Sequence, residues 1–220
     1  DADGHYTTAR DLAKLAAFAM KNEVFREVAA CKSAEVEFGN PPYKRTLYNS
    51  NKMLRRYDGA IGVKTGFTDN ARRCLVSAAE RDGVTLVAVT LNAGDDWNDH
   101  AKMLDYGFEK VTLCEMKYDS SALSLSVVGS EKETVSVECG TVKLPLCNEQ
   151  KDKITAEIYM PKFIYAGLAA GEKVGEIHYL LNGNTIATAP LQTAESCVQK
   201  ERKTDFFTVI YKFIAGLLTR

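Results

Sequence analysis

The sequence predicts an α+β protein in two parts, in which helices around a short sheet are followed by a small all-β domain. Two segments of the first half carry apolar residues at helical spacing, and a pair of β-rich runs lies between them. After about residue 111 the chain consists of short strand-like runs at regular spacing, a pattern typical of an all-β domain. We therefore expect one domain over residues 1–110 and a second over residues 111–200.

The composition is that of an ordinary soluble globular protein: the 220 residues are 45% hydrophobic and 26% charged. The net charge is −1, from 28 basic and 29 acidic residues, so the charge gives no indication of nucleic-acid binding. The six cysteines form no C-x-x-C pair and the three histidines are scattered, which argues against a structural zinc site. We expect no metal, no organic cofactor and no nucleic-acid partner. Cys74 is expected to be a small buried hydrophobe, and the sequence leaves open whether other cysteines form a disulfide.

The first predicted helix begins after Thr8, in the segment HYTTARDLAKLAAFAM. Thr8 can cap this helix, and Asp11 in its first turn complements the positive end of the helix dipole. An apolar stripe at helical spacing follows, made of Leu12, Leu15, Ala16 and Ala19. A second, short helix is expected after Asn22.

Two strands and a third helix complete the predicted first domain. The runs CLVSAA and VTLVAVTLNA are β-rich and are separated by a turn that contains Asp82-Gly83, a strong hairpin signal. The segment DDWNDHAKMLDYGFEKV then predicts a helix with aspartates near its start and its end at Gly107.

The second predicted domain contains alternating apolar residues and tight turns. Its strand-like runs are ALSLSVV, ETVSVE, TVKLPL, KITAEIYM, KFIYAGL and KVGEIHYLLNGNTIATAPL. Apolar residues alternate at Leu123, Leu125 and Val127, and again at Val135 and Val137. Asn182-Gly183 predicts a tight hairpin turn within the last run.

A Lys-Thr-Gly triplet, Lys64 to Gly66, stands just before the first β-rich run. A chain of this length contains such a triplet by chance about one time in twenty, so the triplet alone is weak support for a site. Its placement strengthens it, because a glycine in a strand lets another backbone approach closely. An edge strand of this kind can add an extended peptide, to whose terminal carboxylate Lys64 offers a charge and Thr65 a hydroxyl.

These residues also carry a family resemblance. The segment GVKTGFTDNARRCLVSAAERDG resembles the third active-site motif of the serine D-Ala-D-Ala carboxypeptidases, the low-molecular-mass penicillin-binding proteins. HYTTARDLAKLA is similar to the family's helix after its second motif, and KMLDYGFEKV to the helix that closes the catalytic domain. KVGEIHYLLNGNTIATAPL resembles the end of the family's C-terminal β-domain. Class A β-lactamases share the Lys-Thr-Gly motif, but the predicted β-domain argues against that alternative.

The resemblance implies a fold and a set of site residues. Residues 1–110 would be the C-terminal part of a penicillin-binding-protein/β-lactamase-like transpeptidase domain. Lys64 would stabilise charge near the nucleophile and the substrate carboxylate, and Thr65 would hydrogen-bond that carboxylate. Gly66 would let the peptide lie against the strand, and the backbone N–H of Phe67 would be one of two oxyanion-hole donors. The alternative for Phe67 is that it is an ordinary aromatic residue of a strand. Thr68 and Asp69 are interpreted as a turn into the next strand and are given no catalytic role.

The other two motifs of the family, S-x-x-K and S-x-N, do not occur in this sequence. The segment Tyr48–Asn51 looks superficially like the second motif. It lies just before the Lys-Thr-Gly strand, where the family has a connecting segment, so it is interpreted as a structural turn. The sequence begins at Asp1 without an apolar leader, so we expect that a signal segment or the N-terminal part of a longer protein is missing. The chain is thus expected to hold the substrate-binding strand without the nucleophile, and to be inactive alone. The alternative function is a non-catalytic, membrane-associated module that binds or scaffolds the cell wall.

The resemblance also implies partners and a location. The substrate would be a peptidoglycan stem peptide ending in D-Ala-D-Ala, and β-lactam antibiotics would acylate the same serine, which places the activity in peptidoglycan biosynthesis and cell shape. Residues 203–220 predict an amphipathic helix with a wide apolar face and basic residues suited to anionic lipid headgroups. The plain alternative is a helix packed on the β-domain. We expect an extracytoplasmic protein attached by this helix to the outer face of the cytoplasmic membrane.

Overall fold

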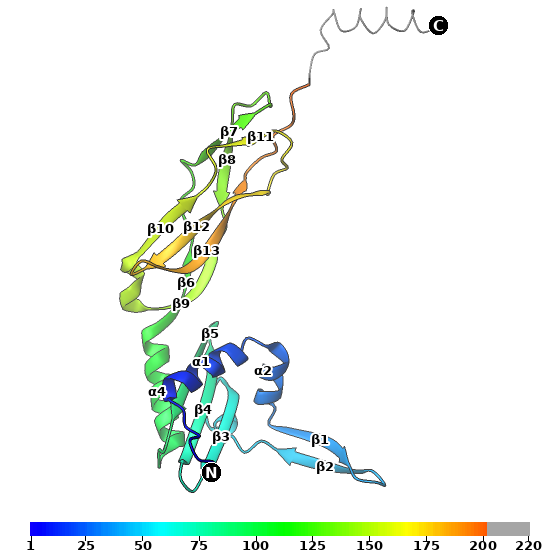
Figure 1. The fold of residues 1–220 in the computed structure, drawn as a ribbon, viewed down its shortest axis with the longest axis vertical. Helices are drawn as coiled ribbons and strands as arrows, with labels where there is room; N and C mark the ends of the chain where they lie inside the picture. Colours follow the sequence, from blue (N-terminus) through cyan, green and yellow to red (C-terminus); the bar gives the residue numbers. More distant parts are fainter. Residues whose placement is uncertain (202–220) are drawn as a thin grey trace, which may run out of the picture. The chain divides into compact units, whose positions relative to one another are not determined.

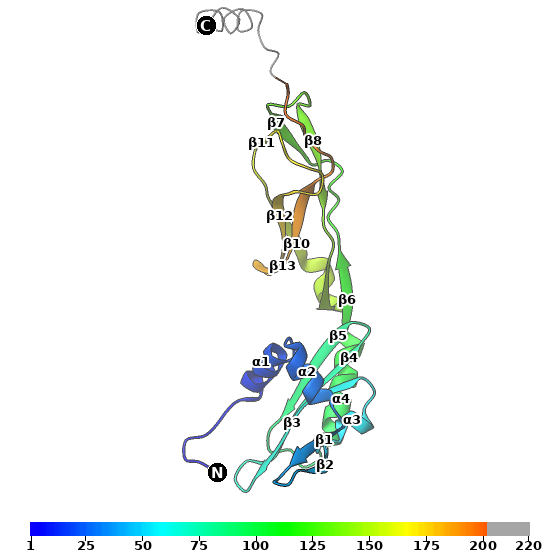
Figure 2. The same ribbon diagram turned by 90° about the vertical axis from the view of Figure 1, so that its right-hand side faces the viewer.

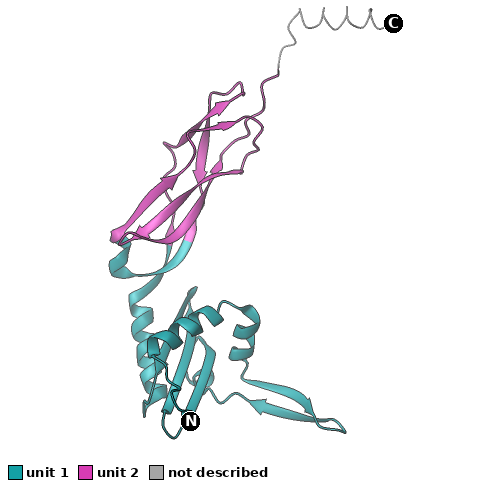
Figure 3. Ribbon diagram, in the orientation of Figure 1, with its two compact units in different colours: residues 1–114, 143–152 teal, residues 115–142, 153–220 magenta. Residues whose placement is uncertain are grey.

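The computed structural model describes residues 1–201, which form two compact units (Figure 3). Unit 1 contains residues 1–114 and 143–152, and unit 2 contains residues 115–142 and the chain from residue 153 onward. The predicted division into a domain over residues 1–110 and a domain over residues 111–200 stays a prediction, because compact units are not the same as domains. The compact units part a few residues later, and unit 1 takes up a second segment.

Unit 1 is built on a three-stranded antiparallel sheet in the order β3–β4–β5 (Figure 1). The strands are β3 (Ala60–Thr68), β4 (Arg72–Arg81) and β5 (Val84–Thr90). The predicted hairpin is confirmed: β4 and β5 are joined by Asp82 and Gly83, whose φ angles are 50° and 76°. Two successive residues with positive φ are what a tight hairpin turn of this kind requires.

The two predicted N-terminal helices are confirmed, the first with its predicted cap. Helix α1 (Ala9–Ala19) begins after Thr8, whose hydroxyl accepts the N–H of Asp11 at 3.1 Å and donates to the Asp11 carboxylate at 2.8 Å. Helix α2 (Glu23–Ala30) begins after Asn22, whose side-chain oxygen accepts a backbone N–H of the first turn at 3.0 Å. Each cap satisfies an N–H that the helix leaves unpaired.

Helix α4 (Asp96–Lys110) covers the face of the sheet opposite to α1 and α2 (Figures 1 and 2). The predicted end of this helix at Gly107 is wrong, because the helix continues to Lys110. A methyl group at position 107 would come within 2.6 Å of a Leu86 side-chain carbon. Glycine is therefore used here to bring α4 close to β5 rather than to end the helix.

The buried core of unit 1 lies between α4 and the sheet, together with the short helix α3 (Met53–Arg56). Its fully buried apolar residues are Met53, Leu75, Ala79, Ala88 and Leu104. Leu75 and Ala79 of β4 face α4. Because side chains alternate along a strand, every second residue between them faces the opposite side, toward α1 and α2. The three-layer order is thus α1 and α2, then the sheet, then α4.

A β-hairpin that the sequence analysis did not predict precedes α3. Strands β1 (Ser33–Phe38) and β2 (Tyr43–Tyr48) form a separate two-stranded sheet, which projects away from β3–β5 (Figure 1). All of its strand residues except Val36 are exposed. Ala34, Val36 and Phe38 alternate with two glutamates along β1, so the sequence carried a strand signal here that was overlooked.

Unit 2 is an all-β unit, as predicted. Its six-stranded sheet has the order β10–β12–β13–β8–β7–β11, in which β11 pairs with β7 in parallel. The strands are β7 (Ser124–Val128), β8 (Thr134–Cys139), β10 (Ile154–Tyr159), β11 (Phe163–Tyr165), β12 (Lys173–Leu181) and β13 (Asn184–Thr193). A separate two-stranded sheet is formed by β6 (Val111–Met116) and β9 (Val142–Cys147), and a 3-10 helix (Asn148–Lys153) follows. Residues 111–114 and 143–152 of these elements belong to unit 1, and the remaining ones belong to unit 2. Strand β6 was not predicted.

The alternation read from the sequence of unit 2 is confirmed in its core. Leu125, Val127, Val135 and Val137 are buried, and Leu123 is partly buried against them. The predicted Asn182-Gly183 turn is confirmed by φ angles of 53° and 75°.

The predicted amphipathic helix over residues 203–220 lies outside the described residues. Among residues 1–201, no helix is both long enough and apolar enough to cross a membrane.

Candidate active site

The Lys-Thr-Gly triplet lies on β3, at the edge of the three-stranded sheet. Lys64 pairs with Val76 of β4, Thr65 with Leu75 and Gly66 with Cys74, all in regular antiparallel register. Lys64 and Gly66 are exposed and Thr65 is half-buried. The triplet therefore lies on a strand at the edge of a sheet, as expected from the sequence.

The backbone of Phe67 points toward the open edge of β3. The carbonyl of Arg73, which lies opposite Phe67, accepts a hydrogen bond from the N–H of Ala93 at 3.0 Å, on the β5 side. In an antiparallel ladder a residue that bonds to one neighbouring strand turns its N–H and C=O away from the other. The pair of Phe67 and Arg73 thus shares no backbone bond, and the N–H of Phe67 is directed away from β4.

Thr65, two residues before Phe67, has the same backbone orientation because the direction alternates along a strand. Its carbonyl accepts a hydrogen bond from the Lys64 ammonium at 2.5 Å. The edge of β3 therefore presents alternate N–H and C=O groups, which is the arrangement that an added extended peptide pairs with.

Gly66 is not required by the fold of the chain itself. A methyl group at this position would meet the Cys74 Cβ at 3.8 Å, an ordinary contact, and the backbone of Gly66 is not in the left-handed region. A side chain at position 66 would point out of the sheet on the face that carries Cys74, which is the α1 face.

An apolar cavity of about 420 Å³ lies beside the triplet on the α1 face of the sheet. Lys64 and Gly66 lie at this cavity together with apolar side chains of α1 and β4, among them Leu12, Leu15 and Val76. Cys74 also lines the cavity and is only partly buried, so the expectation of a buried hydrophobe at this position is wrong. Apart from Lys64 and Thr65, the cavity is lined by apolar residues and Cys74.

Ser50 is a polar neighbour of the triplet that the sequence analysis missed. Its hydroxyl lies 3.1 Å from the hydroxyl of Thr65. The interpretation of Tyr48–Asn51 as a structural turn is therefore incomplete. The signal that was available is the spacing of Asn49 and Asn51, which can fix a turn through their side chains and so place the residue between them.

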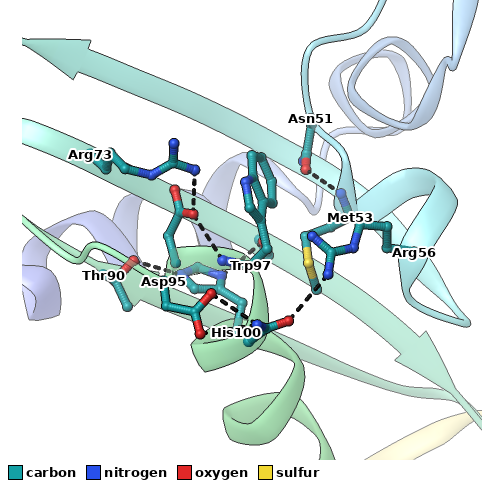
Figure 4. Close-up of polar contacts among 11 residues, drawn as sticks. Asn51, Met53, Arg56, Arg73, Thr90, Asp95, Trp97 and His100 are labelled. Atoms are coloured by element: carbon teal, nitrogen blue, oxygen red, sulfur yellow. Dashed lines mark hydrogen bonds and ion pairs between the residues drawn. The ribbon is translucent and has the colours of Figure 1, made fainter.

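Behind the strand, Arg73 and the start of α4 form a polar cluster (Figure 4). The guanidinium of Arg73 donates to Asp96 at 2.6 Å and lies 5.9 Å from the ring centre of Trp97. The carboxylate of Asp96 also accepts the backbone N–H of Trp97 at 2.9 Å, and only 5% of its side chain is exposed. This ion pair, and the charge that Asp96 places beside it, raise the pKa of Arg73.

His100 is fully buried between α4 and the sheet (Figure 4). Its Nδ1 lies 2.9 Å from the hydroxyl of Ser77 and its Nε2 lies 3.0 Å from the hydroxyl of Thr90. Burial lowers the pKa of His100 to about 4, against the opposing charges of Asp96 and Asp99. A neutral imidazole has one donor and one acceptor nitrogen, so two hydroxyls satisfy it.

The cysteines and acidic residues give no further site. All six cysteines lie within residues 1–201, and none of them is in a disulfide. In this described part of the chain no cluster of His, Cys, Asp and Glu has the size to hold a metal ion.

Comparison with known families divides the chain in two. Residues 1–95 match the model of the D-alanyl-D-alanine carboxypeptidase family. Residues 108–199 match the model of the C-terminal domain of penicillin-binding protein 5.

Curated relatives match nearly the whole chain but only part of their own length. The chain is 30% identical over 224 residues to the D-alanyl-D-alanine carboxypeptidase DacC of Escherichia coli, with 97% of the chain and 53% of the relative covered. It is 25% identical over 217 residues to the carboxypeptidase DacF of Bacillus subtilis, with 94% and 54% covered. A Streptomyces carboxypeptidase is 39% identical over 111 residues, which are 47% of the chain and 38% of that protein. The chain thus spans about half the length of the first two relatives.

A solved structure agrees on the fold. The chain is similar to penicillin-binding protein 5 from Haemophilus influenzae with a TM-score of 0.56 and 22% identity, over 90% of the chain and 59% of that protein. The fold of this chain is therefore penicillin-binding-protein-like with a C-terminal all-β domain.

Proposed function

Because this chain belongs to the family of D-alanyl-D-alanine carboxypeptidases, we propose that it is the C-terminal portion of a serine-type D-Ala-D-Ala carboxypeptidase. In this proposal residues 1–110 complete the peptidase domain and residues 111–200 are its β-domain. The observation that carries the proposal is the open edge of β3, where Lys64, Thr65 and Gly66 stand beside the outward-directed N–H of Phe67. The length of the relatives supports the proposal that the chain is a portion of a longer enzyme, since the chain spans about half of DacC.

Each residue of the edge has a role in the proposed binding of a peptide that ends in D-Ala-D-Ala. The peptide pairs with the backbone groups of β3, and Gly66 leaves room for it because glycine has no side chain. The Lys64 ammonium and the Thr65 hydroxyl bind the terminal carboxylate by charge-assisted hydrogen bonds. The N–H of Phe67 donates to the carbonyl oxygen that becomes negative in the transition state.

The attacking serine is proposed to come from a part of the enzyme that this chain does not contain. That serine, activated by a neighbouring lysine, attacks the penultimate D-Ala carbonyl; the bond to the terminal D-Ala breaks and an acyl-enzyme forms. Water then hydrolyses the acyl-enzyme. A β-lactam would acylate the same serine by opening its ring. The chain alone lacks S-x-x-K and S-x-N and is proposed to be inactive.

The proposed location is the outer face of the cytoplasmic membrane, where peptidoglycan stem peptides are found. Attachment would use residues 203–220, which lie outside the described residues. The sequence supports this role, because the apolar residues of this segment are accompanied by the basic residues Arg202, Lys203, Lys212 and Arg220.

A second candidate is a non-catalytic module that binds or scaffolds the cell wall at the membrane. The absence of S-x-x-K from the sequence favours it. The two candidates differ in the coding sequence upstream of Asp1. The first predicts S-x-x-K and S-x-N motifs there, and an upstream reading frame without them would favour the second.

A further inference from the structure

The segment between β2 and α3 is fixed by the side chains of two asparagines. The Asn49 amide nitrogen donates to the carbonyls of Cys31 at 3.0 Å and Ala29 at 3.4 Å, and its oxygen accepts the N–H of Asn51 at 2.9 Å. The Asn51 oxygen accepts the N–H of Met53 at 3.0 Å (Figure 4), and only 1% of Asn51 is exposed. These bonds anchor the backbone on both sides of position 50.

Arg55 adds a further anchor to the same segment. Its guanidinium donates to the carbonyl of Asn49 at 3.2 Å and to the carbonyl of Lys32 at 2.7 Å. The segment is therefore bonded to the end of α2, to the residue before β1 and to α3, through contacts that do not involve the Ser50 side chain.

Ser50 uses this fixed position to reach the edge strand. Its hydroxyl is exposed and lies 3.1 Å from Thr65 Oγ1, and Ser50, Thr65 and Lys64 line one cavity of about 490 Å³. A residue held so firmly and yet exposed contributes little to the core. The Ser50 hydroxyl contacts Thr65, the residue that binds the substrate carboxylate in the proposed function.

We infer that Ser50 is a positioning residue, which holds the Thr65 hydroxyl in the orientation that binds the substrate carboxylate; this inference rests on the proposed function. A threonine hydroxyl has one hydrogen to donate and two lone pairs. When Thr65 donates its hydrogen to a carboxylate, a lone pair remains to accept the hydrogen of Ser50. The relay from Ser50 to Thr65 to the carboxylate fixes the Thr65 rotamer and strengthens its donated bond.

The orientation of Thr65 can be measured in the 220-residue chain without substrate. Three-bond couplings to the Thr65 methyl carbon report whether its χ1 angle occupies one rotamer or several. We expect one rotamer in the unchanged chain, averaging in Ser50→Ala, and one rotamer again in Ser50→Thr. The control is Ser126→Ala, which removes an exposed hydroxyl from β7 in unit 2. Unchanged couplings in Ser50→Ala would overturn the inference.

The consequence for binding is tested in the full-length protein by the rate of acylation with a fluorescent penicillin. Ser50→Ala should lower this rate about two- to tenfold, the range of a single hydrogen bond, and Ser50→Thr should restore it. In a Thr65→Val background the same Ser50→Ala change should have no further effect, because Ser50 acts through Thr65. Equal losses in both backgrounds would show that Ser50 does not act through Thr65. If the unchanged full-length protein is not acylated at all, the proposed function fails, while the coupling measurement still decides the contact between Ser50 and Thr65.

Discussion

Arg73 of β4 and Asp96 of α4 form an ion pair of 2.6 Å, in which the Asp96 side chain is 5% exposed and that of Arg73 is 43% exposed. The pair joins the strand beside the Lys-Thr-Gly triplet to the first turn of the helix behind it. Because one partner is buried, removing the other leaves an uncompensated carboxylate in the interior.

We predict that Arg73→Ala lowers the free energy of unfolding of unit 1, because it leaves the buried Asp96 carboxylate without its ionic partner. Trp97 is the single tryptophan of the sequence, so its fluorescence during urea unfolding reports on this unit. The matched control is Arg45→Ala, which removes an exposed arginine from β2. An equal, small effect of the two substitutions would contradict the assigned role of the ion pair.

His100 makes the stability of unit 1 depend on pH. Burial lowers its pKa in the folded state to about 4, from an ordinary value of 6.5. As pH falls below 6.5 the unfolded state takes up the proton first, so the free energy of unfolding decreases with falling pH down to about 4. The full effect is about 3 kcal/mol.

The measurement for His100 is urea unfolding at several pH values between 7 and 4, followed by Trp97 fluorescence. His100→Gln should be less stable at pH 7 but lose less stability on acidification than the unchanged chain. His5→Gln, which changes an exposed histidine near the N-terminus, should keep the full pH dependence. If His100→Gln also kept the full pH dependence, titration of groups other than His100 would be responsible for it, and the prediction would be wrong.

Gly66 is predicted to be needed for the ligand and not for the fold. Gly66→Ala should change the free energy of unfolding by less than about 1 kcal/mol, and it should lower penicillin acylation of the full-length protein by at least about tenfold. For comparison, Gly59 has a φ of 78° and a methyl there would lie 2.5 Å from the Glu80 carbonyl oxygen, so Gly59→Ala should destabilise the chain. A Gly66→Ala protein that is stable and fully reactive would contradict the account of the strand.

Membrane attachment is predicted to reside in the C-terminal segment. The intact chain should co-sediment with vesicles that contain anionic phospholipid, and a chain without residues 204–220 should stay in the supernatant. Raising the salt concentration should weaken the binding of the intact chain, because basic residues contribute to it. Equal sedimentation of both chains would place the attachment elsewhere or show that the segment packs on the β-domain.

The parts of the fold that the sequence could predict are those set by neighbouring residues. The cap at Thr8, the helix after Asn22 and the turns at Asp82-Gly83 and Asn182-Gly183 depend on a few adjacent side chains and were predicted correctly. The end of α4 was predicted wrongly because a glycine that ends a helix and one that packs against a strand look alike in sequence.

The candidate site could be predicted only in part. The Lys-Thr-Gly triplet is recognisable as a short pattern, but the approach of Ser50 to Thr65 joins residues 15 positions apart. The partners of His100 come from two strands, one of them 23 residues away. Such contacts follow from strand register and from the asparagine-fixed segment, neither of which a local pattern specifies.

The most direct test of the proposed function is covalent labelling with a fluorescent penicillin, read on a denaturing gel as rate and stoichiometry. We predict that the full-length protein is labelled at one site, and that Lys64→Ala reduces the acylation rate about 10²- to 10³-fold while unfolding is unchanged. We predict no adduct on the 220-residue chain alone. A stoichiometric adduct on the isolated chain, or unchanged kinetics in a well-folded Lys64→Ala protein, would contradict the assignment of β3 as the substrate-binding edge of an enzyme whose nucleophile lies elsewhere.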